Sequence, residues 1–140
     1  MTELQRATTL LQRGYTCILC DRDRILTSKK SGIAPLLERY ESGENAADMC
    51  AADRIVGKAA AMLLTLMGVR AVYGEVMSSA ALTLLQERGI EAAYGTLVPS
   101  IVNRSGDGPC PMEAAVASLT DPVQAPAAIR RALDALRNGR

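Results

Sequence analysis

The segment Gly106–Glu113, which reads Gly-Asp-Gly-Pro-Cys-Pro-Met-Glu, carries the residues best suited to chemistry in this chain. Its glycines and prolines favour a sharply bent loop, and the alanine-rich run that follows predicts a helix beginning at Cys110. Backbone N–H groups at the start of a helix lack partners, and the helix dipole is positive there. A thiolate at Cys110 would therefore be stabilised, and we expect this residue to be a reactive or ligand-contacting thiol.

Glu113, three residues after Cys110, has two interpretations. At the third position of the helix it resembles the glutamate of a capping box, which satisfies N–H groups of its own helix. Alternatively, it lines a pocket together with Cys110 and takes part in catalysis. Residues just upstream could add an amide, a positive charge and glycine N–H groups to a ligand site: Asn103, Arg104, Gly106 and Gly108.

A second candidate group lies in a predicted long helix, from about residue 46 or 48 to 67. Spacing places Cys50, Asp53 and Gly57 on one face of that helix. Gly57 would leave space beside the Asp53 carboxylate for a ligand, or would admit a neighbouring helix or strand at close range. Asp53 would act as an acid or base, or would be a solvated charge in the first turn. Lys58 would point to solvent, or would reach an anionic ligand.

The order of predicted elements is α-β-β-α-α-β-α-β-α-α in one domain, residues 1–140. A leading antiparallel hairpin followed by strand–helix alternation predicts an α/β fold with three layers, α-β-α, around a mixed sheet of four to five strands. Ligands of such sheets gather at strand ends, against helix N-termini. We therefore expect the predicted helix starts at Asp48 and Cys110 to face one site. The predicted strands cover 15–20, 24–28, 69–76 and 90–98.

The composition excludes several classes of function. Lys and Arg number 16 against 15 Asp and Glu, a net charge of +1, which gives no reason to expect nucleic acid or an anionic membrane as a partner. The aromatic residues are four tyrosines without Phe or Trp, so platforms for stacking bases are almost absent. The chain has no histidine, which removes His-based acid–base catalysis and zinc motifs that need imidazole.

The four cysteines are expected to be reduced thiols of a cytoplasmic protein. The chain starts without a charged and then apolar leader, and its strongly apolar stretch, 59–67, is too short for a membrane span, which takes about 20 residues. Cys17 and Cys20 form a CxxC pair inside a predicted strand, where alternation directs the two sulfurs to opposite faces. We interpret the pair as core packing; the alternative is a redox or metal role.

Two motifs carry a resemblance to a known family. They are Asp53-x-x-x-Gly57-Lys58 and Asn103-Arg104-x-Gly106-x-Gly108-x-Cys110-Pro111-Met112-Glu113. Over nearly the whole chain, the sequence resembles the small bacterial and archaeal proteins called domain of unknown function 1893. The resemblance implies a fold similar to that of cytidine deaminases, with a mixed five-stranded sheet between helices. It implies a site location but no reaction, because the family has no settled one.

The zinc motif of deaminases is matched only in part. Deaminases hold zinc with a His or Cys two residues before a catalytic Glu, and with two cysteines spaced as Pro-Cys-x-x-Cys. Pro109 and Cys110 match the second element, but Glu113 stands where the second cysteine belongs. Cys50 and Asp53 are three apart, so no register supplies both the ligand and the base. We therefore expect no metal cofactor; if zinc is bound, the ligands would be Cys50, Cys110 and Glu113.

Three functions remain open at this point. The first, which we prefer, is a zinc-independent site for a small molecule, nucleotide-like by analogy of fold. The second is a zinc-dependent hydrolase of the deaminase type acting on a nucleobase or nucleoside. The third is a non-catalytic binding or assembly module, and in any case we expect a homo-oligomer. In the first function the catalytic residues would be Asp53, Cys110 and Glu113, and the ligand contacts would be Gly57, Lys58, Asn103, Arg104, Gly106 and Gly108.

Overall fold

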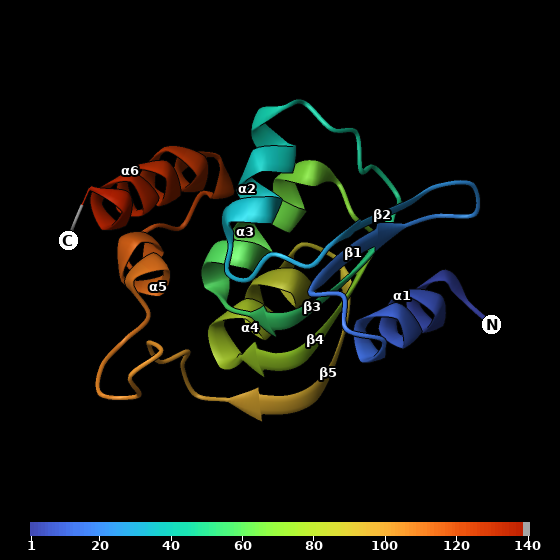
Figure 1. The fold of residues 1–140 in the computed structure, drawn as a ribbon, viewed down its shortest axis with the longest axis horizontal. Coiled ribbons are helices and arrows are strands. Elements are labelled where there is room, and N and C mark those ends of the chain that lie inside the picture. Colours follow the sequence, from blue (N-terminus) through green and yellow to red (C-terminus); the bar gives the residue numbers. More distant parts are fainter. Residues whose placement is uncertain (139–140) are drawn as a thin grey trace.

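Five strands form one mixed sheet in the computed structural model, which describes residues 1–138 (Figure 1). The strand order is β2-β1-β3-β4-β5. β1 is antiparallel to both β2 and β3, whereas β3, β4 and β5 are parallel. The strands are β1 (Cys17–Cys20), β2 (Ile25–Ser28), β3 (Cys50–Val56), β4 (Ala71–Ser78) and β5 (Glu91–Val98).

Helices cover both faces of the sheet, so the fold has the three predicted layers. The antiparallel pair of β1 and β2 is the predicted leading hairpin. α1 packs alone against β1, β3 and β4, and Figure 1 shows it on the side of the sheet away from the other helices. The opposite face carries the larger core, beneath α3 and α4. The helices are α1 (Glu3–Gln12), α2 (Ala34–Glu41), α3 (Lys58–Met67), α4 (Ser79–Glu87), α5 (Pro111–Val116) and α6 (Ala125–Arg137).

The central helix α3 is buried along nearly its whole length. Its residues 59–64 are all buried, and other helices pack around it: α2, α4, α5 and α6. A helix that is apolar on every side is stable only inside a protein, which explains its place at the centre of the larger core. α3 ends at Gly68, whose φ of 82° is the left-handed conformation that glycine adopts without strain.

The predicted helix over residues 46–67 is wrong in its first half. Residues 50–56 form strand β3, and the helix begins only at Lys58. Asp48 has a left-handed φ of 63°, so no helix starts there. Ala51 and Ala52 are buried on the two faces of this central strand, where small side chains let the covering layers approach closely. Cys50 and Asp53 therefore do not share a helical face.

Alternation along the strands sorts the cysteines and Asp53 between the two cores. Cys17 belongs to the larger core and Cys20 to the smaller core under α1, as the sequence predicted for this pair. Asp53 lies two residues after Ala51, so its side chain is directed to the face of the larger core.

Within residues 1–138, no helix is both long enough and apolar enough to cross a bilayer.

Candidate active site

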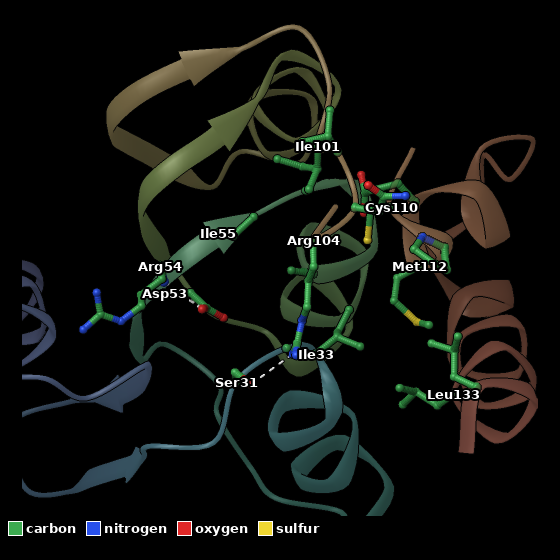
Figure 2. A pocket seen from close by; sticks show the side chains of 18 of the residues that line it. Ser31, Ile33, Asp53, Arg54, Ile55, Ile101, Arg104, Cys110, Met112 and Leu133 are labelled. Carbon is green, nitrogen blue, oxygen red and sulfur yellow. Dashed lines mark hydrogen bonds between the residues drawn. The ribbon is translucent and has the colours of Figure 1, made fainter. Parts of the chain in front are cut away.

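A cavity of about 410 Å³ opens at the edge of the sheet where the parallel strands end. β3 contributes its last residues to the wall, and the loop from β5 to α5 closes the opposite side (Figure 2). Because β1 runs antiparallel, its start and the loop after β2 reach the same edge. The position agrees with the general rule that ligands of open α/β sheets bind at the carboxyl ends of the strands.

The wall of the cavity is mainly aliphatic. Its apolar side chains come from β3, from the loops after β2 and β5, and from α5 and α6; none of the described residues that line it is aromatic. A ligand would therefore contact branched side chains and methionine rather than stack on rings. These apolar side chains include Ile33, Ile55, Ile101, Met112, Leu133 and Leu136.

Asp53 is half-buried on β3, and its carboxylate points into the cavity, whereas the side chain of Arg54 points away (Figure 2). Burial raises the pKa of Asp53 to about 7, against hydrogen bonds from the N–H groups of Arg54 and Ile55 and the charge of Arg54, which lower it. The Arg54 N–H lies 2.8 Å from the carboxylate, but its guanidinium is 3.7 Å from the Glu75 carboxylate. The pKa of Asp53 is consequently well above that of an exposed aspartate.

Glu113 caps α3 rather than its own helix. Its two carboxylate oxygens accept hydrogen bonds from the N–H groups of Lys58, at 2.7 Å, and Ala59, at 3.0 Å. These are orphan donors of the first turn of α3, where a negative charge is favoured. The interpretation of Cys110 and Glu113 as a capping box is therefore wrong, because the carboxylate reaches across to a helix that begins 55 residues earlier.

Gly57 makes that cap possible. A Cβ atom at Gly57 would lie 2.5 Å from the Glu113 carboxyl carbon, far inside van der Waals contact. Of the two interpretations of Gly57 in the sequence, the structure favours close approach of a neighbouring element over free space for a ligand. The element is the Glu113 side chain itself.

Cys110 is the N-cap residue of α5, and its side chain makes no capping hydrogen bond. Its N–H donates to the carbonyl of Ile101 at 3.1 Å, and its sulfur is directed into the cavity (Figure 2). Cys110 is half-buried, whereas the other three cysteines are buried. Burial raises the pKa of each of those three thiols: Cys17, Cys20 and Cys50. Cys110 is thus the accessible thiol of the chain.

The loop between β5 and α5 holds itself together. The Asn103 amide donates to the Asp107 carboxylate at 3.0 Å and accepts from the Asp107 N–H at 3.2 Å. The Arg104 side chain donates to the Ser31 hydroxyl at 3.2 Å and so joins the β5–α5 loop to the loop after β2 (Figure 2). Asn103 and Arg104 both line the cavity, but the amide of Asn103 is already used within its loop.

Three of the predicted ligand contacts do not line the cavity. The Gly106 N–H donates to the Asn103 carbonyl at 3.0 Å, and the Gly108 carbonyl accepts from the Asn103 N–H at 2.8 Å, so both glycines shape the loop. The Lys58 ammonium donates to the carbonyl of Ala117 at 3.1 Å and is directed away from the cavity.

The conditional zinc ligands do not come together. Cys50 begins β3 and lies opposite Cys20, six residues before Val56, so about 20 Å of strand separates it from the start of α3, where Glu113 is bound. Cys110 and Glu113 lie at the other end of that strand. Across residues 1–138, no three His, Cys, Asp or Glu side chains are grouped to hold a metal ion. The structure therefore does not bring Cys50, Cys110 and Glu113 together.

Part of the wall was missed by reasoning from the sequence. The loop after β2 contributes Ser31 and Ile33, and α6 contributes Leu133 and Leu136. Thr16 also reaches the wall, with its hydroxyl bonded to the carbonyls of Ser28 and Lys30. The antiparallel hairpin, which the sequence does predict, was the available signal, because it brings the start of β1 and the end of β2 to this edge.

The family model described as a domain of unknown function (DUF1893) matches residues 6–133. The chain belongs to the DUF1893 family. Among solved structures, a DUF1893 family protein from Thermotoga maritima is similar, with 28% sequence identity and a TM-score of 0.81. The similarity covers 96% of this chain and 91% of that one. No curated protein matches the chain. The expected likeness to cytidine deaminases stays a prediction.

The contact between Gly57 and Glu113 in this DUF1893 domain predicts strong coupling between two substitutions. Gly57→Ala should lower the free energy of unfolding by about 1–3 kcal/mol, because the new methyl group displaces the carboxylate. Glu113→Ala should cost about 0.5–2 kcal/mol through the lost cap. The double variant should cost less than the sum by about 1 kcal/mol, since the methyl group then meets no carboxylate. Denaturant unfolding of the four proteins measures this difference.

The matched control pairs Gly57→Ala with Glu87→Ala, which removes an exposed carboxylate from α4. Those two substitutions should be additive. If Gly57→Ala and Glu113→Ala are additive as well, the carboxylate does not occupy the space beside Gly57.

Asp53 predicts an unusual dependence of stability on pH for the DUF1893 domain. Its pKa rises from an ordinary 3.8 to about 7 on folding, so between these values the folded chain binds more protons than the unfolded chain. Stability from this group is therefore present below about pH 4 and is lost as the pH rises towards 7. Asp53→Asn should raise the free energy of unfolding more at pH 8 than at pH 4, by up to about 4 kcal/mol.

Denaturant unfolding across this pH range tests the expectation, with Asp23→Asn as the control because Asp23 is exposed on the β1–β2 turn. The control variant should track the parent at every pH. An effect of Asp53→Asn that is the same at pH 4 and pH 8 would show that Asp53 titrates in its ordinary range.

Proposed function

We propose that the cavity binds a small molecule without zinc, that Asp53 exchanges a proton with this ligand, and that the Cys110 thiol contacts it. One observation carries the proposal: a carboxyl group with a pKa raised to about 7 and the accessible thiol line the same cavity. Perturbed titratable groups in a concave site are the usual mark of acid–base chemistry.

The size and wall of the cavity support a ligand of moderate size. About 410 Å³ lies within the range of small-molecule sites, which are mostly apolar with a few polar groups that fix orientation. The aliphatic side chains would hold an apolar or heterocyclic body. At the mouth, the Arg104 guanidinium, held by Ser31, would pair with an anionic group of the ligand.

A nucleotide-like ligand fits these groups. Its base would take the apolar interior beside Asp53, and its phosphate would lie at Arg104. The choice of a nucleotide over other anionic heterocycles depends on the resemblance of the family to deaminase-like folds, which is an analogy of fold. Binding measured against nucleosides, nucleotides and other anionic heterocycles decides between these classes.

Proton exchange is the chemistry that Asp53 offers. A carboxyl with a pKa near the working pH is present in both protonation states, so it can donate a hydrogen bond to a ligand or accept a proton from it. Glu113 is less suited to this role, because both of its oxygens already accept backbone N–H groups of α3. We therefore assign the acid–base role to Asp53 and a structural role to Glu113.

The zinc-dependent alternative has little support in the donor set. Of the three proposed ligands, Cys50 lies at the far end of β3 and Glu113 is committed to α3. Cys110 would be left as a single thiolate, whereas zinc sites use three or four protein ligands. The zinc-independent site is therefore the function that this arrangement favours.

Ligand binding and thiol protection test the proposal together. Purified protein is screened by ligand-observed NMR against nucleosides, nucleoside monophosphates and heterocyclic carboxylates. Binding should be at least about tenfold weaker in Asp53→Asn, which corresponds to about 1.4 kcal/mol, and should change with pH near 7. Bound ligand should also slow the alkylation of Cys110, which without ligand should react faster than the three buried cysteines.

The control variant is again Asp23→Asn, which should bind like the parent protein. Equal affinity in Asp53→Asn and the parent would remove Asp53 from the site. Alkylation of all four cysteines at equal rates would remove the special role of Cys110. If no member of the panel binds, the assignment of a nucleotide-like ligand is wrong.

A further inference from the structure

Cys20 and Cys50 lie directly opposite each other on the antiparallel strands β1 and β3. Residues paired in this way have Cα atoms about 4.5–5.5 Å apart, and their side chains project from the same face of the sheet. A disulfide requires a Cα separation of about 4.4–6.8 Å. The register of the sheet therefore gives Cys20 and Cys50 a Cα separation that a disulfide can bridge, at the end of β3 opposite the cavity.

The first turn of α1 covers this pair. The Cys20 thiol donates a hydrogen bond to the Glu3 carbonyl, with sulfur and oxygen 3.2 Å apart. Both cysteines are fully buried and both are free thiols in this structure. The end turns of helices open more readily than the rest of a fold, so a small reagent can reach the thiols when the first turn of α1 opens.

Arg6 supplies a positive charge beside Cys20. One of its terminal nitrogens donates to the carbonyl of Asp21, but its Nε is buried and has no hydrogen-bond partner among residues 1–138. Burial raises the pKa of both thiols, while the guanidinium of Arg6 beside Cys20 and that of Arg70 beside Cys50 lower it. A Cys20 thiolate would accept a hydrogen bond from the Nε–H of Arg6, which has no partner while Cys20 is a neutral thiol.

We propose that Cys20 and Cys50 are a cross-strand dithiol that a peroxide converts to a disulfide. The Cys20 thiolate attacks one oxygen of hydrogen peroxide, the O–O bond breaks, and hydroxide leaves, so that Cys20 becomes a sulfenic acid. The Cys50 sulfur then attacks the Cys20 sulfur, the S–O bond breaks, and the oxygen leaves as water with the Cys50 proton. Two thiols are oxidised, and one peroxide is reduced to two waters.

The other two cysteines do not belong to this pair. Cys17 faces the larger core on the opposite side of the sheet, where Asp53 is its partner on β3. Cys110 lies at the cavity, at the other end of β3. The pairing of Cys20 with Cys50 is therefore set by the register of β1 against β3, and a variant that keeps only those two cysteines isolates it.

The test uses the full chain with Cys17→Ser and Cys110→Ser, so that Cys20 and Cys50 are the remaining thiols. The folded variant is treated with hydrogen peroxide at neutral pH, quenched with an alkylating reagent, and analysed by intact mass and by peptide mapping. We expect a monomer lighter by two hydrogens, with the peptides of Cys20 and Cys50 joined. The matched control carries Cys20→Ser and Cys110→Ser, and its remaining Cys17 and Cys50 should form no intramolecular disulfide.

A second pair of variants tests the part assigned to Arg6. Arg6→Met keeps the apolar stem and removes the charge, and it should slow disulfide formation at least tenfold in the Cys17→Ser, Cys110→Ser background. Arg13→Met, on the exposed end of the same helix, should leave the rate unchanged. Circular dichroism confirms that each variant is folded.

Three results would overturn the proposal. One is a folded variant whose Cys20 and Cys50 stay reduced or are oxidised only to separate acids. Another is an equal yield of disulfide from the Cys17 and Cys50 control. The third is a disulfide that forms only in denaturant, since the register of the folded sheet would then play no part.

Discussion

The candidate site depends on the contact between the Glu113 carboxylate and the first turn of α3. This contact joins two segments 55 residues apart in the sequence, at hydrogen-bond distances of 2.7 and 3.0 Å. It satisfies N–H groups that the N-cap residue Gly57, which has no side chain, leaves without a partner. Because Glu113 lies one turn after Cys110, the same contact fixes the start of α5, and with it the thiol, over the end of β3.

The use of Glu113 as a cap also limits the charge that this residue presents to the cavity. The Glu113 carboxylate is balanced by the positive end of the α3 dipole. The Arg54 guanidinium is directed towards the Glu75 carboxylate. Asp53 is thereby left facing a mainly aliphatic wall, where its ionised form is poorly solvated. Burial in this surrounding thus accounts for the raised pKa of Asp53, the property on which its proposed acid–base role depends.

The fold could be predicted from the sequence more completely than the site. Gly and Pro punctuation and apolar runs were enough for the hairpin, the mixed sheet and the three layers. The failure at residues 50–56 has a physical cause, since alanine favours helices locally but also fits a central strand pressed between two layers. Asp53 and Cys110 were both named from the sequence, yet the reason given for Asp53, a helical face shared with Cys50, was wrong.

The role of Glu113 could not be foreseen, because a capping box and a cap on a distant helix use the same residue at the same spacing. The contact of Gly57 with Glu113, the bridge from Arg104 to Ser31 and the α6 side chains all depend on how distant segments meet. Such contacts follow from tertiary packing and leave no local pattern. The same holds for the pairing of Cys20 with Cys50, which is a matter of strand register.

The most direct test of this account is the titration of Asp53 itself. In protein labelled with carbon-13 in aspartate, the carboxyl resonance of Asp53, assigned by its loss in Asp53→Asn, is followed from pH 3 to pH 9. The account predicts a midpoint near the pKa of about 7 that burial gives this group. A midpoint at the ordinary aspartate value of about 4 would contradict it, because the cavity would then hold a fully ionised carboxylate and no proton to exchange.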